Sequence, residues 1–111
     1  MPKRITEGKS PWLAERHYHW HPPSGPPRLV TLCLGPPHQT GGDWACRVNV
    51  TGLEVESDQL VHGMDALQAL ELGIEFLALT LTRSKEHRAG RITLFDVPLT
   101  QPKPVRKARK K

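Results

Sequence analysis

The sequence predicts an α+β domain, in which a small antiparallel sheet of four to five strands has one long helix packed across one face. Three observations lead to this class. Residues 63–83 form one apolar segment with helical spacing, several short segments before it alternate between apolar and polar residues, and one more alternating segment follows it. The expected order is therefore β-β-β-(β)-α-β, which is typical of an antiparallel sheet with a helix on one face.

The first predicted strand covers residues 12–20, WLAERHYHW. Side chains alternate between the two faces of a strand, so Tyr18 and Trp20 share one face. We expect this aromatic face to be buried. The strand ends before HPPSGPP at residues 21–27, because proline cannot donate a backbone N–H to a sheet ladder.

The second and third predicted strands cover residues 28–35, RLVTLCLG, and residues 43–50, DWACRVNV, on either side of a PPHQTGG loop. Alternation gives each strand an inward face. The inward residues are Val30, Leu32 and Leu34, then Trp44, Cys46, Val48 and Val50; the outward residues are Leu29, Thr31, Cys33, Ala45, Arg47 and Asn49. The two cysteines therefore lie on opposite faces, and a disulfide between them would require a different register in one strand.

Two further strands complete the expected sheet. Residues 53–62, LEVESDQLVH, are compatible with a fourth strand over residues 59–62, with the acidic residues 54–58 as an exposed turn. After the helix, residues 91–97, RITLFDV, form the last strand, with Ile92 and Leu94 inward.

The long helix has a clear start signal at Asp65, whose carboxylate can accept a backbone N–H from the first turn. Gln68 can reach back as in a capping box, and Gly63 allows a sharp turn into the helix, which we expect to end near Ser84. The expected buried stripe is Leu67, Leu70, Ile74, Leu77 and Leu81, widened by Ala66, Ala69, Leu72, Phe76 and Leu79. Either several elements cover so wide a stripe, or its edge at Leu72, Phe76 and Leu79 faces another protein chain.

The positive charge of the chain is concentrated at its C-terminal end. The 111 residues include 16 basic and 11 acidic residues, a net charge of +5. Six of the basic residues are Lys103, Arg106, Lys107, Arg109, Lys110 and Lys111. We expect a flexible N-terminus over residues 1–11, a single domain over 12–97, and a proline-rich, then basic, disordered tail over 98–111.

No signal peptide is visible, because no apolar run follows the N-terminal charges, and the helix carries too many carboxylates for a membrane span. The expected location is the cytoplasm, without membrane contact. The basic tail could bind nucleic acid or another polyanion without reading sequence, or it could be a solvated end.

His17, His19 and His21 occupy alternate positions, so in a strand their imidazoles project from one face and could share a zinc or nickel ion. However, side chains two residues apart on a flat strand lie roughly 6.5–7 Å from each other, which suits a single tetrahedral ion badly. The alternative is a solvent-facing strand. We expect no cofactor.

Cys46 and His62 are the only residues that suggest a nucleophile and a base. Alternation buries the Cys46 thiol beside Trp44 and Val48, where it packs as a small apolar group. No glycine-rich phosphate loop, GxSxG, HExxH or paired CxxC motif is present. We therefore expect the protein not to be an enzyme.

WACRVNVTG at residues 44–52 and HGMDALQALELG at residues 62–73 resemble a family of small, uncharacterised bacterial proteins. The shared pattern is a W-x-C strand, a glycine turn and G-x-D-x-x-Q-A-L at the start of the helix. The resemblance implies a fold and a bacterial source, but no reaction. The chain is also similar to HicB-like antitoxin domains, which would imply a protein partner such as a small toxin.

These observations favour a protein-interaction module, which binds another protein or associates with itself along the wide apolar helix or an open sheet edge. The alternatives are a weak polyanion binder that acts through the tail and a metal-dependent enzyme that uses the histidine strand.

Overall fold

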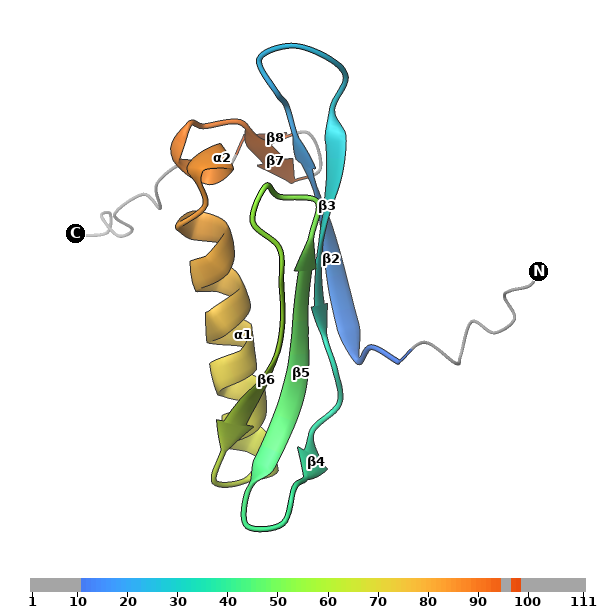
Figure 1. Ribbon diagram of the computed structural model, residues 1–111, viewed down its shortest axis with the longest axis vertical. Coiled ribbons are helices and arrows are strands. Elements are labelled where there is room, and N and C mark those ends of the chain that lie inside the picture. The colour runs from blue at the N-terminus through green and yellow to red at the C-terminus, as the bar shows by residue number, and fades with distance from the viewer. Residues whose placement is uncertain (1–10, 95–96, 99–111) are drawn as a thin grey trace, which may run out of the picture.

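The computed structural model of the chain describes residues 11–94 and 97–98. The α+β class, the antiparallel sheet and the long helix across one face are confirmed (Figure 1). The elements are β2 (Ala14–Trp20), β3 (Arg28–Leu34), β4 (His38–Gln39), β5 (Trp44–Thr51), β6 (Ser57–Gly63), α1 (Ala66–Thr82), α2 (Lys85–Arg88), β7 (Ile92–Leu94) and β8 (Val97–Pro98).

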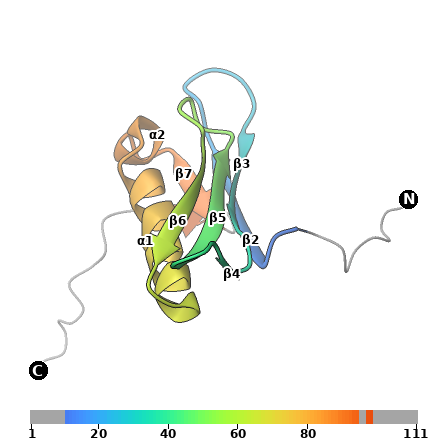
Figure 2. The ribbon, with the colours of Figure 1, turned by 60° about the horizontal axis from the view of Figure 1, so that its bottom comes forward.

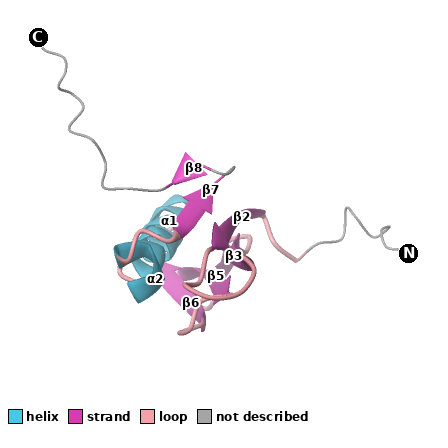
Figure 3. Ribbon diagram, turned by 90° about the horizontal axis from the view of Figure 1, so that it is seen from above, coloured by secondary structure: helices cyan, strands magenta, loops and turns pink. Residues whose placement is uncertain are grey.

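The sheet runs in the order β6-β5-β3-β2-β7-β8, and every pair is antiparallel. β4 pairs with the start of β5 and so continues the line of β3. Both helices lie on the same side of this sheet (Figure 3). Among the described residues, no helix covers the other face (Figure 3).

α1 is not centred on the sheet. It packs mainly against β5 and β6 and less against β3, so that it runs along one half of the sheet (Figure 2). The helix side of β2 is therefore left partly uncovered.

The core lies between α1 and the sheet and confirms the predicted inward faces. The buried residues of the strands include Tyr18, Val30, Leu32, Leu34, Cys46, Val48, Val50 and Ile92. Trp20 and Trp44 are half-buried and pack against this core.

Two residues of the outer face are buried. Ala45 points outward as predicted, but it is fully buried, because β4 and β6 flank it on both sides. Cys33 does lie on the outer face, yet it is buried as well, next to Glu15. Both cysteines are free.

The N-cap of α1 is confirmed. Asp65 Oδ1 accepts the backbone N–H of Gln68 at 2.8 Å, and Gln68 Oε1 accepts the backbone N–H of Met64 at 2.7 Å. Gly63 allows the close approach of β6 to the first turn, because a Cβ there would lie 2.5 Å from the backbone nitrogen of Ala69.

The predicted buried stripe of α1 was partly wrong. Its buried residues are Ala69, Gly73, Leu77 and Leu81, whereas Leu67 and Ile74 are 66% and 57% exposed. The stripe is centred on the small residues Ala69 and Gly73, which let the helix backbone approach the sheet. The prediction relied on the large apolar side chains alone and therefore placed the centre of the stripe part of a helical turn away from where it lies.

Several element boundaries also differ. β6 begins at Ser57 rather than residue 59, because it pairs with β5 along its whole length. The single strand expected over 91–97 is two short strands, β7 and β8, that pair with each other. β4 lies inside the segment expected to be a loop, and α2 forms after α1 with Ser84 as its N-cap.

No helix in the described residues is long and apolar enough to cross a membrane.

Candidate functional site

The first half of β2 is an open sheet edge. β3 pairs with β2 from Ala14 to Trp20, but β7 pairs only with His19 and Trp20. Among the residues that the structure describes, no strand pairs with the other side of Ala14–Tyr18. Unpaired edge groups of this kind can pair with an incoming strand.

A groove of about 280 Å³ lies beside this edge, between β2, β3 and α1. Tyr18, Leu32 and Leu34 line its sheet side, and Ile74, Leu77 and Ala78 line its helix side. The groove exists because α1 is offset towards β5 and β6. Its lining is mainly apolar, with Glu15 and Arg16 at the rim.

The predicted partner-facing edge of α1 is less exposed than the opposite flank. Leu72 and Leu79 are 37% and 39% exposed, and Phe76 is half-buried against the core. Ile74, which lines the groove, and Leu67, which precedes it by two turns, expose larger fractions. The groove is therefore bordered by a more exposed apolar residue of the helix than those of the predicted edge.

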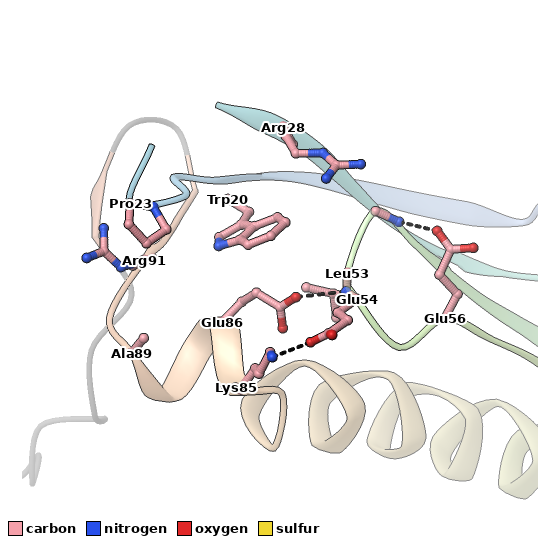
Figure 4. A pocket seen from close by; sticks show the side chains of 11 residues that line it. Trp20, Pro23, Arg28, Leu53, Glu54, Glu56, Lys85, Glu86, Ala89 and Arg91 are labelled. Atoms are coloured by element: carbon pink, nitrogen blue, oxygen red, sulfur yellow. Dashed lines mark hydrogen bonds and ion pairs between the residues drawn. The ribbon is translucent and has the colours of Figure 1, made fainter. Parts of the chain in front are cut away.

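A second concave surface lies at the other end of β2. It is a cleft of about 850 Å³ formed by the end of β2, the turn after β5, and α2 with the residue that precedes β7 (Figure 4). Trp20, Pro23 and Leu53 provide apolar lining, and six charged residues surround them. These are Arg28, Glu54, Glu56, Lys85, Glu86 and Arg91.

Glu86 is the one buried charged residue of the described chain, with 4% exposure. Its Oε2 accepts the backbone N–H of Glu54 at 2.7 Å and thereby ties α2 to the turn after β5. Lys85 forms an ion pair with the side chain of Glu54, and this contact raises the pKa of Lys85.

Two further contacts shape the cleft. The Glu56 carboxylate accepts the Gly52 N–H at 2.8 Å, within the turn after β5. The Arg28 guanidinium lies over the Trp20 ring, 5.5 Å from its centroid.

The three histidines in and just after β2 do not converge on a point. His17 Nδ1 hydrogen-bonds the Thr31 hydroxyl at 3.0 Å, and His21 Nε2 hydrogen-bonds the Thr93 hydroxyl at 2.9 Å. The His19 and His21 ring centroids are 6.5 Å apart. Within residues 11–94 and 97–98, no group of three or more His, Cys, Asp or Glu side chains is placed to hold a metal ion.

The structure separates Cys46 from His62. Cys46 is opposite Val61 in the β5–β6 register, so its side chain is on the helix side, and His62 points to the other face. The thiol of Cys46 donates to the Ala69 carbonyl at 3.0 Å, and burial raises its pKa. His62 Nδ1 lies 3.2 Å from the Asp43 carboxylate.

The basic residues Lys103, Arg106, Lys107, Arg109, Lys110 and Lys111 lie outside the described residues, and so does most of the predicted tail. Polyanion binding by the tail stays a prediction.

Sequence reasoning did not find the cleft. Glu86 lies in the charged segment KEHR, which looks like a solvated helix end, and a buried acidic residue has no distinct signature there. The pairing of Trp20 with Arg28 across the strands follows only once the β2–β3 register is known.

The fold and these surfaces define a class: a small α+β domain with one long helix offset on a single antiparallel sheet, and a concave surface at each end of β2. The chain belongs to a family described as a domain of unknown function, DUF6968, whose model matches residues 14–103. Comparison with curated proteins and with solved structures found no match. Membership of an uncharacterised family agrees with the resemblance seen in the sequence, while the likeness to HicB-like domains and the bacterial source stay predictions.

Proposed function

We propose that this domain is a protein-binding module whose partner adds an extended segment to the open edge of β2. One observation carries the proposal: the Ala14–Tyr18 edge, which no strand of the described residues covers, lies directly beside an apolar groove. In binding by strand addition, main-chain hydrogen bonds provide affinity and pockets for alternate side chains provide specificity. This edge offers both.

The hydrogen bonds between β2 and its neighbours indicate which backbone N–H groups of β2 would bind the partner. His21 donates its backbone N–H to the Arg91 carbonyl, just before β7. N–H groups point to opposite sides at successive residues of a strand, so those of Glu15 and His17 point the same way as that of His21. They therefore face the open edge.

The side chains on the helix side of β2 indicate the chemistry of the partner. Ala14, Arg16 and Tyr18 share this side, and Arg16 has no ion-pair partner among the described residues. Cross-strand neighbours share a face, and opposite charges in such pairs are favourable. The partner segment should carry an acidic residue opposite Arg16, with apolar residues two positions away on each side that enter the groove.

The test uses synthetic peptides. One contains Val-Thr-Asp-Thr-Leu between short polar ends, and its matched control has Lys in place of Asp. We expect the Asp peptide to bind about fivefold more tightly, because opposed and like charges each change a cross-strand pair by up to about 1 kcal/mol. In amide hydrogen exchange, the Asp peptide should protect the backbone N–H groups of Glu15 and His17.

Two variants make the test specific to the edge. His17→Pro removes one outward-facing N–H, a change that edge strands tolerate. His17→Ala loses the same side-chain contact with Thr31 but keeps the N–H. We expect the proline variant to lose peptide binding and the alanine variant to retain it.

Three results would overturn the proposal. The first is unchanged exchange at Glu15 and His17 with saturating Asp peptide. The second is equal binding of the Asp and Lys peptides. The third is a dimer of the free protein, seen in light scattering and abolished by His17→Pro, because a second copy would then occupy the edge in place of a different partner.

A further inference from the structure

We propose that the cleft at the end of β2 is a second binding site, which takes a small zwitterionic ligand of the amino-acid or short-peptide class. The ammonium group of the ligand would lie between the Trp20 ring and the Glu86 carboxylate, and its carboxylate would lie at Arg91. This site is separate from the open edge of β2 and does not depend on the proposed function.

Glu86 is the primary reason to expect a cationic group. Glu86 as a whole residue is 4% exposed and lines the cleft, yet the only hydrogen bond of its carboxylate in the described structure comes from the Glu54 N–H. The neighbouring Lys85 forms its ion pair with the Glu54 side chain, and it attracts the Glu86 carboxylate without pairing with it directly (Figure 4). A buried carboxylate without a cation in direct contact is unfavourable, so a ligand ammonium group beside it would offset part of its desolvation.

Trp20 provides the second contact for this group. Its ring lies between Arg28 on one side and Glu86 on the other (Figure 4). A cation on the Glu86 side would contact both a carboxylate and an aromatic ring, and both attractions strengthen where water is excluded. The apolar part of the ligand would lie against Leu53 and Pro23.

Arg91 provides the site for the opposite end of the ligand. It has no carboxylate partner among the described residues, and its Nη1 donates to the His21 carbonyl at 3.4 Å. A guanidinium group binds a carboxylate well because its parallel N–H groups match the two oxygens.

The overall charge of the cleft selects the class of ligand. Three basic and three acidic residues line it, so its formal net charge is zero. This balance favours a ligand that carries both signs over a polyphosphate or a polyamine. A volume of about 850 Å³ is also within the usual range for small-molecule sites, which is about 300–1,000 Å³.

The test uses the tripeptide Gly-Leu-Gly as the probe, together with its N-acetylated and C-amidated forms, which lack the ammonium group and the carboxylate. The readout is the indole N–H signal of Trp20 in proton–nitrogen NMR spectra, assigned with Trp20→Phe. We expect the tripeptide to shift this signal at millimolar concentration. Each blocked form should bind about tenfold more weakly, because it loses one charge-assisted contact.

Variants of the chain provide an independent test of the same site. Glu86→Gln keeps an acceptor for the Glu54 N–H but removes the charge. It should weaken binding of the tripeptide about tenfold. Arg88→Gln, on the same short helix but outside the cleft lining, is the matched control and should bind as the natural chain does. If Glu86→Gln fails to fold, the comparison of the free and N-acetylated probes on the natural chain decides the question.

The proposal is overturned if about 10 mM tripeptide leaves the Trp20 signal unchanged, since binding weaker than this contributes little free energy. It is also overturned if the N-acetylated form binds as well as the free form. Equal shifts of the Trp20 and Trp44 signals would indicate non-specific association and would likewise contradict it.

Discussion

A Cβ atom at Gly73 would lie 2.6 Å from the sulfur of Cys46. This relationship fixes how closely α1 approaches β5. The same sulfur donates to the Ala69 carbonyl at 3.0 Å, so one thiol contacts the helix at two neighbouring turns. Leu34 also lies 2.8 Å from the position of that Cβ, which leaves no space for a side chain.

We therefore expect Gly73→Ala to destabilise the protein by about 1–3 kcal/mol, even though alanine is the better helix former, because overpacking a core forces neighbours out of position. Urea unfolding measures the change. Gly42→Ala is the control, since nothing lies within 4 Å of a Cβ there. Combining Gly73→Ala with Cys46→Ala should restore part of the loss; strictly additive effects of the two changes would contradict the contact.

The same contact explains what the sequence could and could not predict about the helix. The N-cap at Asp65 follows from local chemistry and was correct. The buried face did not follow from the large apolar residues, because Gly73 and Ala69 define it through close approach. Ile74 was predicted inside and is exposed, since the helix lies over β5 and β6 rather than over β2.

Asp65→Ala should destabilise the protein by about 0.5–2 kcal/mol, because the Gln68 N–H loses its side-chain acceptor. Asp65→Asn keeps an oxygen that can accept this bond, and its effect should be smaller. Thermal unfolding of the two variants measures the difference. Equal losses for alanine and asparagine would show that the cap bond is unimportant for α1.

The two thiols should make the protein less stable at alkaline pH. Burial raises the pKa of Cys46, and burial together with the Glu15 carboxylate raises the pKa of Cys33, both from the ordinary value of 9.0. The unfolded chain then loses these protons first as the pH rises. Their contribution to stability is fully present below pH 9 and is lost as the pH rises through the raised values.

Urea unfolding at a series of pH values from neutral to alkaline tests this expectation. The double variant Cys33→Ala, Cys46→Ala should show a shallower loss of unfolding free energy above pH 9 than the natural chain, because lysines and tyrosine contribute equally to both. Parallel curves for the two proteins would refute the role of the thiols.

Removal of residues 103–111 should abolish binding to heparin, if the predicted tail binds polyanions. The described residues carry seven basic and nine acidic side chains, a net charge of −2, so the folded part has little attraction for a polyanion. Binding by the full chain should weaken steeply with salt, because it releases counterions. Retention of heparin on the truncated chain at low salt would place the site elsewhere.

The candidate sites were harder to predict than the fold because both depend on where elements end. The strand predicted over 91–97 would have paired with most of β2, whereas within the described residues β7 pairs only with His19 and Trp20. Strand alternation places Tyr18 and Trp20 on the helix side, and this was correct. It does not show that the offset of α1 leaves a groove beside Tyr18.

Glu86→Ala should destabilise the protein more than Glu86→Gln does. The alanine variant leaves the partly buried Glu54 N–H without its acceptor, which costs up to about 1–3 kcal/mol, while glutamine can still accept this bond. Urea unfolding compares the two, and hydrogen exchange at the Glu54 N–H reports the local effect. If exchange at Glu54 accelerates in both variants alike, the charge rather than the acceptor holds the turn after β5 against α2. If it is unchanged in Glu86→Ala, that hydrogen bond does not hold the turn in place.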